Sequence, residues 1–245
     1  MVDKSPLRIR AMFDQISPRY DFLNHLLSLN SDVLWRRRAA ALLDLERACP
    51  PKHDGQAPRR RVLDVCSGTG DLAFELQRRW GAEVVGSDFA YRMLEIGKLK
   101  ASRRSLGGRV RFQQADTLRL PYRDGVFDAS TVAFGIRNVV DAERGISEMT
   151  RVVRSGGRVV ILEFTLPANG LLRKGYLAYF GNVLPQLGRM IARSEIDAYK
   201  YLPDSVARWP QPEELKSMME RSGLRSVTYE LVFGGVAAIH TGLKP

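Results

Sequence analysis

Short apolar runs alternate with amphipathic stretches through the middle of the chain, from residue 61 onwards. The runs have the length of buried strands, and the stretches between them repeat their apolar residues at helical spacing. We predict strands over 61–65, 83–88, 110–115, 127–134 and 158–164, with helices over 71–80, 91–102 and 141–153. Strands that alternate with helices in this way favour a parallel sheet that helices cover on both faces.

The last part of the chain departs from this alternation. A helix is predicted over 212–222, because proline suits the first turn of a helix. Two strands follow, over 226–233 and 236–242, and Gly234-Gly235 between them is typical of a hairpin turn. The sheet is therefore expected to end in an antiparallel pair, which separates this pattern from most nicotinamide-binding folds.

The N-terminal residues 1–50 are predicted to be a helical segment, interrupted at Ser17-Pro18, that folds over the site as a lid. A run of helix breakers over 49–58 (CPPKHDGQAP) then makes a loop. Residues 51–245 form the main domain, and the two parts make one globular unit. The polar N-terminus lacks the apolar stretch of a signal peptide, and no run of 18 apolar residues predicts a membrane span.

One turn is assigned from its glycines. Ser155-Gly156-Gly157 follows the helix predicted over 141–153. Helices commonly end with a glycine just past their last turn. We therefore expect these residues to close that helix before the next strand begins.

A glycine-rich turn over 62–71 (VLDVCSGTGD) follows the first predicted strand and opens a helix. Gly68 and Gly70 allow the backbone to pass close to a ligand, and the helix N-terminus offers unpaired N–H groups to an anion. Asp88 ends the second strand, where its carboxylate can accept hydrogen bonds from both hydroxyls of a ribose. Asp116-Thr117 follows the third strand, where an acidic group can accept from the exocyclic amine of adenine.

These features leave more than one cofactor open. Gly68, Gly70 and Ala73 also match a loose dinucleotide-binding pattern, and a purely structural glycine turn is a further alternative. Asp64 inside the strand, the adenine contact expected of Asp116 and the terminal hairpin favour S-adenosylmethionine. We therefore predict a class I S-adenosylmethionine-dependent methyltransferase: a Rossmann-like α/β fold with a mostly parallel seven-stranded sheet, helices on both faces and an antiparallel hairpin at its end.

Three stretches resemble the UbiE/MenG family of C-methyltransferases of menaquinone and ubiquinone biosynthesis. They are 12–24 (MFDQISPRYDFLN), 133–139 (AFGIRNV) and 151–164 (RVVRSGGRVVILEF). The resemblance spans nearly the whole chain. It implies that S-adenosyl-L-methionine contacts Thr69, Asp88, Asp116 and Thr117, and we add as cofactor-binding residues Gly68, Gly70, Phe89 and Ala133. Many members of the family have serine where this chain has Ala133, so a hydroxyl contact is lost there.

The family's reaction moves a methyl group from the sulfonium to a ring carbon of an isoprenylated quinol. The resemblance favours demethylmenaquinol as the acceptor, and a 2-polyprenyl-6-methoxy-1,4-benzoquinol of ubiquinone synthesis is the alternative. The ring carbon becomes nucleophilic only when an adjacent hydroxyl is deprotonated, so the site must stabilise a quinolate anion. It must also hold the ring in line with the S–CH3 bond.

Three residues are predicted to be catalytic. Arg137 follows the fourth strand and is the first candidate for electrostatic stabilisation of the quinolate, with Asn138 orienting the same oxygen. Tyr20 is expected to close the sulfonium pocket or to bind the ring hydroxyl. The alternatives are structural: Arg137 pairs with a carboxylate, and Tyr20 packs helices. His25 and His240 fit a structural role better than that of a base.

The apolar stretch 171–192 has two compatible interpretations, a cover helix for one sheet face and an opening for the isoprenoid tail. The candidate lining residues are Leu171, Leu172, Tyr176, Tyr179, Phe180, Val183 and Leu184. The candidates for contact with anionic lipid headgroups are Arg173, Lys174, Arg189 and Arg193.

A net charge of +11 suits nucleic acid or an anionic membrane surface, and a basic proteome or simple solubility is a further alternative. A nucleic-acid-binding protein is the alternative from another functional class, but the chain has no recognised nucleic-acid module, and we expect no nucleic acid partner. Cys49 and Cys66 lack metal-ligand spacing, so we predict no metal. We expect a cytoplasmic enzyme, peripheral on the inner face of the cytoplasmic membrane, with a homodimer as an open alternative to a monomer.

Overall fold

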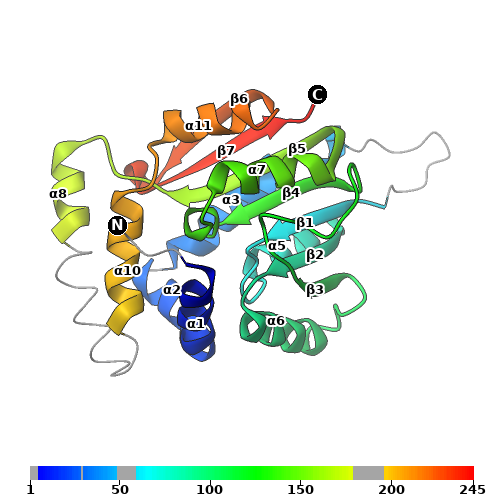
Figure 1. The fold of residues 1–245 in the computed structure, drawn as a ribbon, viewed down its shortest axis with the longest axis horizontal. Coiled ribbons are helices and arrows are strands. Elements are labelled where there is room, and N and C mark those ends of the chain that lie inside the picture. Colours follow the sequence, from blue (N-terminus) through cyan, green and yellow to red (C-terminus); the bar gives the residue numbers. More distant parts are fainter. Residues whose placement is uncertain (1–4, 29, 49–58, 179–195) are drawn as a thin grey trace.

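The computed structural model describes residues 5–28, 30–48, 59–178 and 196–245, and Figure 1 shows its arrangement. Seven strands form one sheet in the order β3-β2-β1-β4-β5-β7-β6. The strands are β1 (Arg61–Val65), β2 (Glu83–Asp88), β3 (Val110–Gln114), β4 (Phe127–Ala133), β5 (Val153–Phe164), β6 (Arg225–Val232) and β7 (Ala237–Leu243). The first five pair in parallel, whereas β7 runs antiparallel to both β5 and β6. The predicted α/β fold with a terminal antiparallel pair is confirmed.

Helices cover both faces of this sheet. One face carries α3 (Ser31–Leu42), α5 (Asp71–Trp80) and α6 (Tyr91–Arg103), and the other carries α7 (Ala142–Val152) and α11 (Pro212–Arg221). In Figure 1, α7 lies in front of the sheet and α3 behind it. Each face buries its own apolar cluster, because the strands of a parallel sheet have no side that faces water.

The N-terminal segment divides into two parts. The first consists of α1 (Pro6–Ile16), the 3-10 helix η1 (Ser17–Arg19) and α2 (Tyr20–Leu27), and the break expected at Ser17-Pro18 falls in η1. The second part, α3 and the short α4 (Leu45–Ala48), packs into the core, where Ala40, Leu43 and Leu45 are fully buried. Of the described N-terminal elements, α1, η1 and α2 thus lie outside the layers that cover the sheet. The predicted boundary at residue 50 lies outside the described residues.

The helix ending expected at Ser155-Gly156-Gly157 is wrong. Helix α7 ends at Val152, and strand β5 begins at the next residue, so these glycines lie inside a strand. The register between β4 and β5 shifts between Phe127 and Ala129, and a Cβ at Gly157 would lie 2.4 Å from the carbonyl oxygen of Asp128. A glycine within a strand often marks such an irregularity or a close backbone approach, and here that signal outweighs the helix-ending signal.

In the part of the C-terminal region that the structure describes, α8 (Gly170–Ala178), α10 (Ile196–Ala207) and α11 join the hairpin. Helix α8 contains the beginning of the stretch predicted over 171–192, of which residues 179–192 lie outside the described part of the chain. Helix α10 leads to α11, and the 3-10 turn η4 (Phe233–Gly235) joins β6 to β7. Among the described residues, no helix has both the length and the apolar character that crossing a bilayer requires.

Candidate active site

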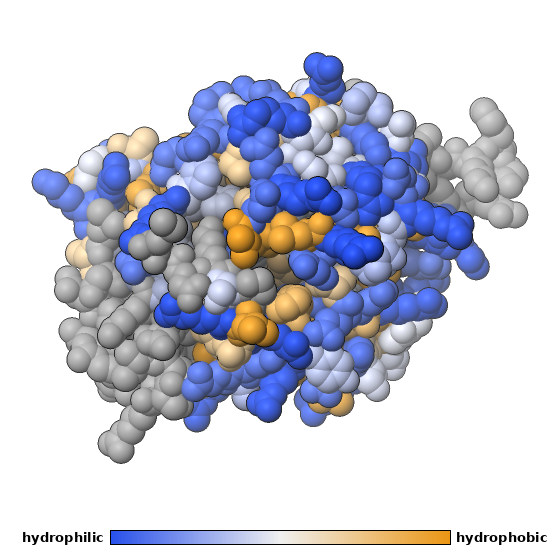
Figure 2. Space-filling model, viewed as in Figure 1, coloured by the Kyte–Doolittle hydropathy of each residue, from blue (hydrophilic) through white to orange (hydrophobic). Residues whose placement is uncertain are grey.

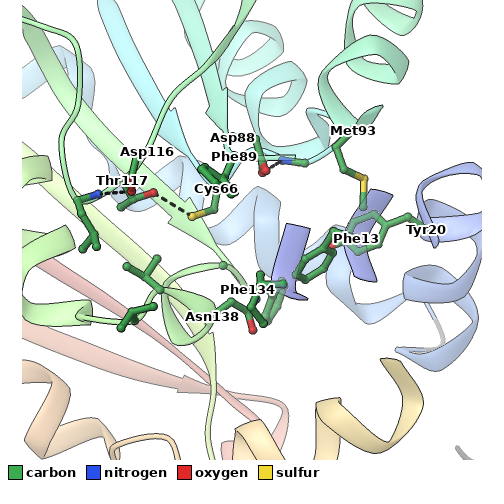
Figure 3. Close-up of a pocket in the computed structure, with 16 residues that line it drawn as sticks. Phe13, Tyr20, Cys66, Asp88, Phe89, Met93, Asp116, Thr117, Phe134 and Asn138 are labelled. Atoms are coloured by element: carbon green, nitrogen blue, oxygen red, sulfur yellow. Dashed lines mark hydrogen bonds between the residues drawn. The ribbon is translucent and has the colours of Figure 1, made fainter. Parts of the chain in front are cut away.

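A cavity opens at the carboxyl ends of the parallel strands, the edge where ligands of open α/β sheets bind. It measures about 800 Å³ including its open mouth. Figure 2 shows apolar residues gathered around a hollow on this face of the molecule. The cavity is lined by Ile9, Phe13, Tyr20, Cys66, Gly68, Asp88, Phe89, Met93, Asp116, Thr117, Leu118, Phe134, Gly135, Asn138, Val139 and Val140. Figure 3 shows that Phe13 and Tyr20 reach it from the N-terminal helices, opposite Asp116 and Thr117.

The glycine-rich turn forms one wall of the cavity. Gly68 and Gly70 have φ values of 54° and 90°, a backbone conformation that residues with a side chain rarely adopt. A Cβ at Gly70 would also lie 2.5 Å from the ring of Phe112. The turn is tied to β2, because the backbone N–H of Gly68 donates to Oδ2 of Asp88 at 2.8 Å. Gly70 is therefore required both by its positive φ and by the lack of room for a side chain next to Phe112.

Asp88 lies at the end of β2, in the cavity wall. Its Oδ1 accepts from the backbone N–H of Ala90 at 2.8 Å, so each carboxylate oxygen has one acceptor site left for a ligand hydroxyl. Burial raises the pKa of this carboxyl, while the backbone N–H groups of Ala90 and Gly68 lower it. Phe89 beside it also lines the cavity and has the guanidinium of Arg10 5.8 Å from its ring centre. A diol such as ribose fits this arrangement.

Asp116 and Thr117 form the opposite wall, just beyond β3. The carboxylate of Asp116 is exposed and accepts at Oδ1 from the backbone N–H of Leu118 at 2.9 Å. Thr117 is buried, with its hydroxyl 3.5 Å from Sγ of Cys66. Leu118 and Val139 add apolar surface to the same wall. Oδ2 of Asp116 accepts no hydrogen bond from the described residues, and a carboxylate oxygen of this kind beside an apolar wall suits a flat ring that carries an amine.

Thr69, Gly70 and Ala133 do not line this cavity. The Thr69 hydroxyl donates to Oδ1 of Asp21 at 2.5 Å and accepts from Nζ of Lys100 at 2.9 Å, a network that ties α2 to the glycine turn. Thr69 and Ala133 instead line a smaller adjoining cleft, which shares Tyr20 and Cys66 with the main cavity.

Asp64 lines that smaller cleft and is not among the cofactor-binding residues predicted from the sequence. Its Oδ1 accepts from the Thr131 hydroxyl at 2.9 Å, whereas Oδ2 makes no well-formed hydrogen bond with the described residues. The hydroxyl of Ser67 is likewise buried without a partner in the described part of the chain. Burial raises the pKa of Asp64 to about 7. A cationic donor in the cleft would satisfy this carboxylate, and its position just before the glycine turn was the available signal.

Two of the predicted catalytic residues line the cavity. The ring of Tyr20 packs edge-on against Phe13 with ring centres 6.0 Å apart. Burial raises the pKa of the Tyr20 hydroxyl, while a hydrogen bond with Asn24 and the charges of Arg36 and Arg137 lower it. Asn138 lies in the 3-10 helix η2 (Ile136–Asn138), and its Oδ1 accepts from the hydroxyl of Tyr201 at 3.0 Å. That bond leaves the Asn138 amide nitrogen as the group available for donation.

Arg137, the third predicted catalytic residue, is not among the cavity-lining residues. Its guanidinium is buried, where it donates to Oε1 of Glu163 at 2.7 Å and to the carbonyl oxygen of Phe134. The guanidinium also lies 5.2 Å from the ring centre of Phe164. Burial raises the pKa of Glu163, and the charge of Arg137 opposes that effect. The structural alternative for Arg137, an ion pair with a carboxylate, is thus present.

His25 and His240 lie outside the cavity. His25 contacts Asp32, with Nδ1 3.0 Å from Oδ2. His240 is buried in β7, and its Nε2 lies 2.8 Å from the carbonyl oxygen of Pro212. Burial lowers the pKa of His240 to about 4, which keeps it neutral near pH 7. Among the described residues, no group of three or more His, Cys, Asp or Glu side chains is placed to hold a metal ion.

Sequence comparisons agree with this geometry. The model of the ubiE/COQ5 methyltransferase family matches residues 1–244. A demethylmenaquinone methyltransferase of Thermus thermophilus is 52% identical over 235 residues, which cover 96% of this chain and 100% of that protein. One of Deinococcus radiodurans is 45% identical, covering 96% and 92%. A ubiquinone/menaquinone biosynthesis C-methyltransferase UbiE of a Geobacter species is 43% identical, covering 97% and 96%.

Solved structures of lower identity share the fold. A SAM-dependent methyltransferase of Thermotoga maritima matches with a TM-score of 0.62 at 18% identity, covering 97% of this chain and 100% of that one. A phosphoethanolamine N-methyltransferase of Haemonchus contortus, solved with phosphomonomethylethanolamine and S-adenosylhomocysteine, matches with a TM-score of 0.65 at 13% identity, covering 97% and 60%.

Proposed function

Because this chain belongs to the ubiE/COQ5 methyltransferase family, we propose that it transfers a methyl group from S-adenosylmethionine to a ring carbon of demethylmenaquinol. The observation that best supports this proposal is the cavity at the strand ends. There Gly68 and Asp88 form a polar wall opposite apolar residues of the N-terminal helices. The test is to incubate the protein with labelled S-adenosylmethionine and a reduced, short-tailed demethylmenaquinone. Labelled menaquinol supports the proposal, and binding of the donor without transfer contradicts it.

The residues present fit the methyl donor, which supplies an electrophilic methyl group when it is bound. We assign the ribose hydroxyls to Asp88 and the adenine amine to the free oxygen of Asp116, with Phe89 and Thr117 in the same wall. The methionine ammonium is assigned to Asp64, whose Oδ2 lacks a well-formed hydrogen bond with the described residues. The remaining predicted contacts, Thr69, Gly70 and Ala133, border the same cleft or turn.

The acceptor ring is proposed to lie under α1 and α2, where Phe13 and Tyr20 exclude water. The amide nitrogen of Asn138 is placed to donate to the ring oxygen as negative charge develops on it. Arg137 lies behind the cavity wall: burial raises the pKa of Tyr20, and the charge of Arg137 is one of the effects that oppose this rise. We therefore propose that Arg137 stabilises the quinolate electrostatically and holds η2, rather than that it contacts the substrate.

Naphthoquinol is proposed ahead of benzoquinol because the relatives at 52% and 45% identity are both named demethylmenaquinone methyltransferases. Other relatives carry names for both pathways, so the benzoquinol is the second substrate to test. We also propose that the protein works at the inner face of the cytoplasmic membrane, where its isoprenylated acceptor resides. A homodimer stays a prediction, which sedimentation of the purified protein tests.

A further inference from the structure

An apolar surface lies where α8 meets the turn between β6 and β7. Leu171 is 82% exposed, Leu172 53% and Phe233 70%, with Leu231 of β6 nearby at 51%. A Cβ at Gly234 would lie 3.2 Å from Cδ1 of Leu172, so α8 and the turn are in contact. These four exposed side chains are called the α8 patch below. Figure 1 shows α8 at the outer end of the molecule.

The backbone fixes this surface in place. Oδ1 of Asn169 accepts from the backbone N–H groups of Leu171 and Leu172 at 2.9 and 3.1 Å, which caps the start of α8. Phe233 has a φ of 49°, an unfavourable backbone conformation for a bulky residue. The fold therefore holds a strained residue whose ring is mostly in solvent, although burial of that ring would stabilise the protein.

On its α8 side the patch is flanked by positive charges, whereas Glu230 beside Leu231 is paired with Arg38. Arg173 and Lys174 follow the two leucines directly in α8 and are exposed. Residues 164–178 include no Asp or Glu, so the local chain carries only positive charge. Exposed apolar side chains flanked by cations are typical of segments that lie in the interface of an anionic bilayer.

The patch is also connected to the active site. The ring of Phe233 lies 6.2 Å from the ring of Trp35, and Trp35 lies 6.0 Å from Phe134, which lines the cavity. A surface on which the patch rests would therefore lie close to the edge of the sheet that holds the cavity. This arrangement suits an acceptor whose ring enters the protein while its tail remains in lipid.

We propose that the α8 patch inserts into the surface of an anionic lipid bilayer, with Arg173 and Lys174 at the headgroups. The proposal rests on the proposed function, because it is the isoprenylated quinol that requires a bilayer. It deepens that function by naming the face that meets the membrane.

The test is co-sedimentation of the purified full chain with phosphatidylcholine vesicles, with and without phosphatidylglycerol. The variant Leu171→Asp/Phe233→Asp is expected to partition about tenfold less onto the anionic vesicles, because two large apolar side chains leave the interface. Leu99→Asp/Val126→Asp is the matched control, since Leu99 is 59% and Val126 38% exposed and the change in charge is the same, and its partition is expected to match that of the unmodified protein. Equal partition of the patch variant and the control overturns the proposal.

A charge-reversal variant separates lipid binding from other uses of the patch. Arg173→Glu/Lys174→Glu is expected to lose the part of the binding that depends on phosphatidylglycerol. Sedimentation without vesicles tests whether a second copy of the protein covers the patch instead. If the patch variant no longer self-associates but still binds vesicles, the patch is assigned to a second copy and the proposal is overturned. Turnover of a soluble, short-tailed quinol is expected to be unchanged in Arg173→Glu/Lys174→Glu, because both side chains are exposed and lie outside the cavity. If the unmodified protein does not turn over this quinol at all, the proposed function is contradicted, but the lipid-binding surface is not.

Discussion

Arg137 and Glu163 form an ion pair in the protein interior, with Nη1 2.7 Å from Oε1 and exposed side-chain fractions of only 7% and 1%. The carboxylate also accepts from the backbone N–H of Arg137 at 3.3 Å and from that of Phe164 at 2.9 Å. The pair therefore fixes η2, which carries Asn138, against strand β5.

Replacement of Arg137 by alanine separates catalysis from cofactor binding. The Arg137→Ala variant is expected to bind S-adenosylmethionine with unchanged affinity and to lose most of its turnover. It is also expected to be less stable by about 3 to 5 kcal/mol, because Glu163 is left buried without its partner. Titration calorimetry with the donor, turnover and denaturant unfolding measure the three quantities.

A second variant serves as the control for that experiment. Glu163→Gln keeps a hydrogen-bond acceptor beside Arg137 but removes the negative charge, so it is expected to retain more turnover than Arg137→Ala. A loss of donor affinity in Arg137→Ala as large as its loss of turnover would remove Arg137 from the account of catalysis.

Asp64 predicts a pH dependence of donor binding. Its pKa of about 7 means that the carboxyl is partly protonated near neutrality. An ammonium group binds the ionised form, so the affinity for S-adenosylmethionine is expected to rise from pH 6 to pH 8. Calorimetry in two buffers of different ionisation enthalpy measures both the affinity and the released proton.

Asp64→Asn is the corresponding variant, because it keeps the size and one acceptor. Its donor affinity is expected to be lower by about tenfold or more, since a charged hydrogen bond contributes about 1.5 to 3 kcal/mol. Its affinity is also expected to be flat over the same pH range. A slope that persists in the variant would assign the titration to another group.

The layers of the fold could be predicted from the sequence because each strand and helix carries its own periodicity. The strands at 61–65 and 83–88 have the predicted bounds, since buried parallel strands are short, continuous apolar runs. Ser155-Gly156-Gly157 was misassigned because glycine serves both helix ends and strand irregularities. Which role it takes here depends on Asp128 in a neighbouring strand, a contact that local sequence does not contain.

The site residues could be predicted in part. Gly68, Asp88 and Asp116 follow from a turn and from strand ends, which topology brings to one edge. The position of the Arg137 guanidinium depends on its ion pair with Glu163, and the orientation of the Asn138 amide depends on its hydrogen bond with Tyr201. Both partners are distant in the chain, and no local pattern marks them as neighbours.

Tyr201 is expected to act by orienting Asn138. Tyr201→Phe removes the hydroxyl that donates to Oδ1 of Asn138, so the amide is free to rotate. Turnover is expected to fall by about three- to tenfold, the effect of one neutral hydrogen bond, with donor affinity unchanged. Tyr91→Phe on α6, where Tyr91 is 42% exposed, is the matched control and is expected to be neutral. Equal activities of the two variants would contradict this role.

His240 predicts acid sensitivity of the fold. Its pKa of about 4 lies below the usual value near 6.5, so between these values the unfolded chain binds a proton that the folded protein does not. The free energy of unfolding is therefore expected to fall as the pH drops from about 6.5 to 4, by about 3 kcal/mol in total from this group. Urea unfolding at several pH values measures it. His240→Gln is expected to weaken this pH dependence. If the variant shows the same pH dependence of stability as the unmodified protein, the effect does not come from His240.

The most direct test of the central claim is identification by mass of the product formed from S-adenosylmethionine and each reduced acceptor. The purified protein is offered demethylmenaquinol and, separately, the demethylated benzoquinol. Our account predicts a product heavier by one methylene unit, with the new methyl group on a ring carbon of the naphthoquinol. A protein that binds the donor but leaves both quinols unchanged, or that methylates only a hydroxyl oxygen, would contradict it.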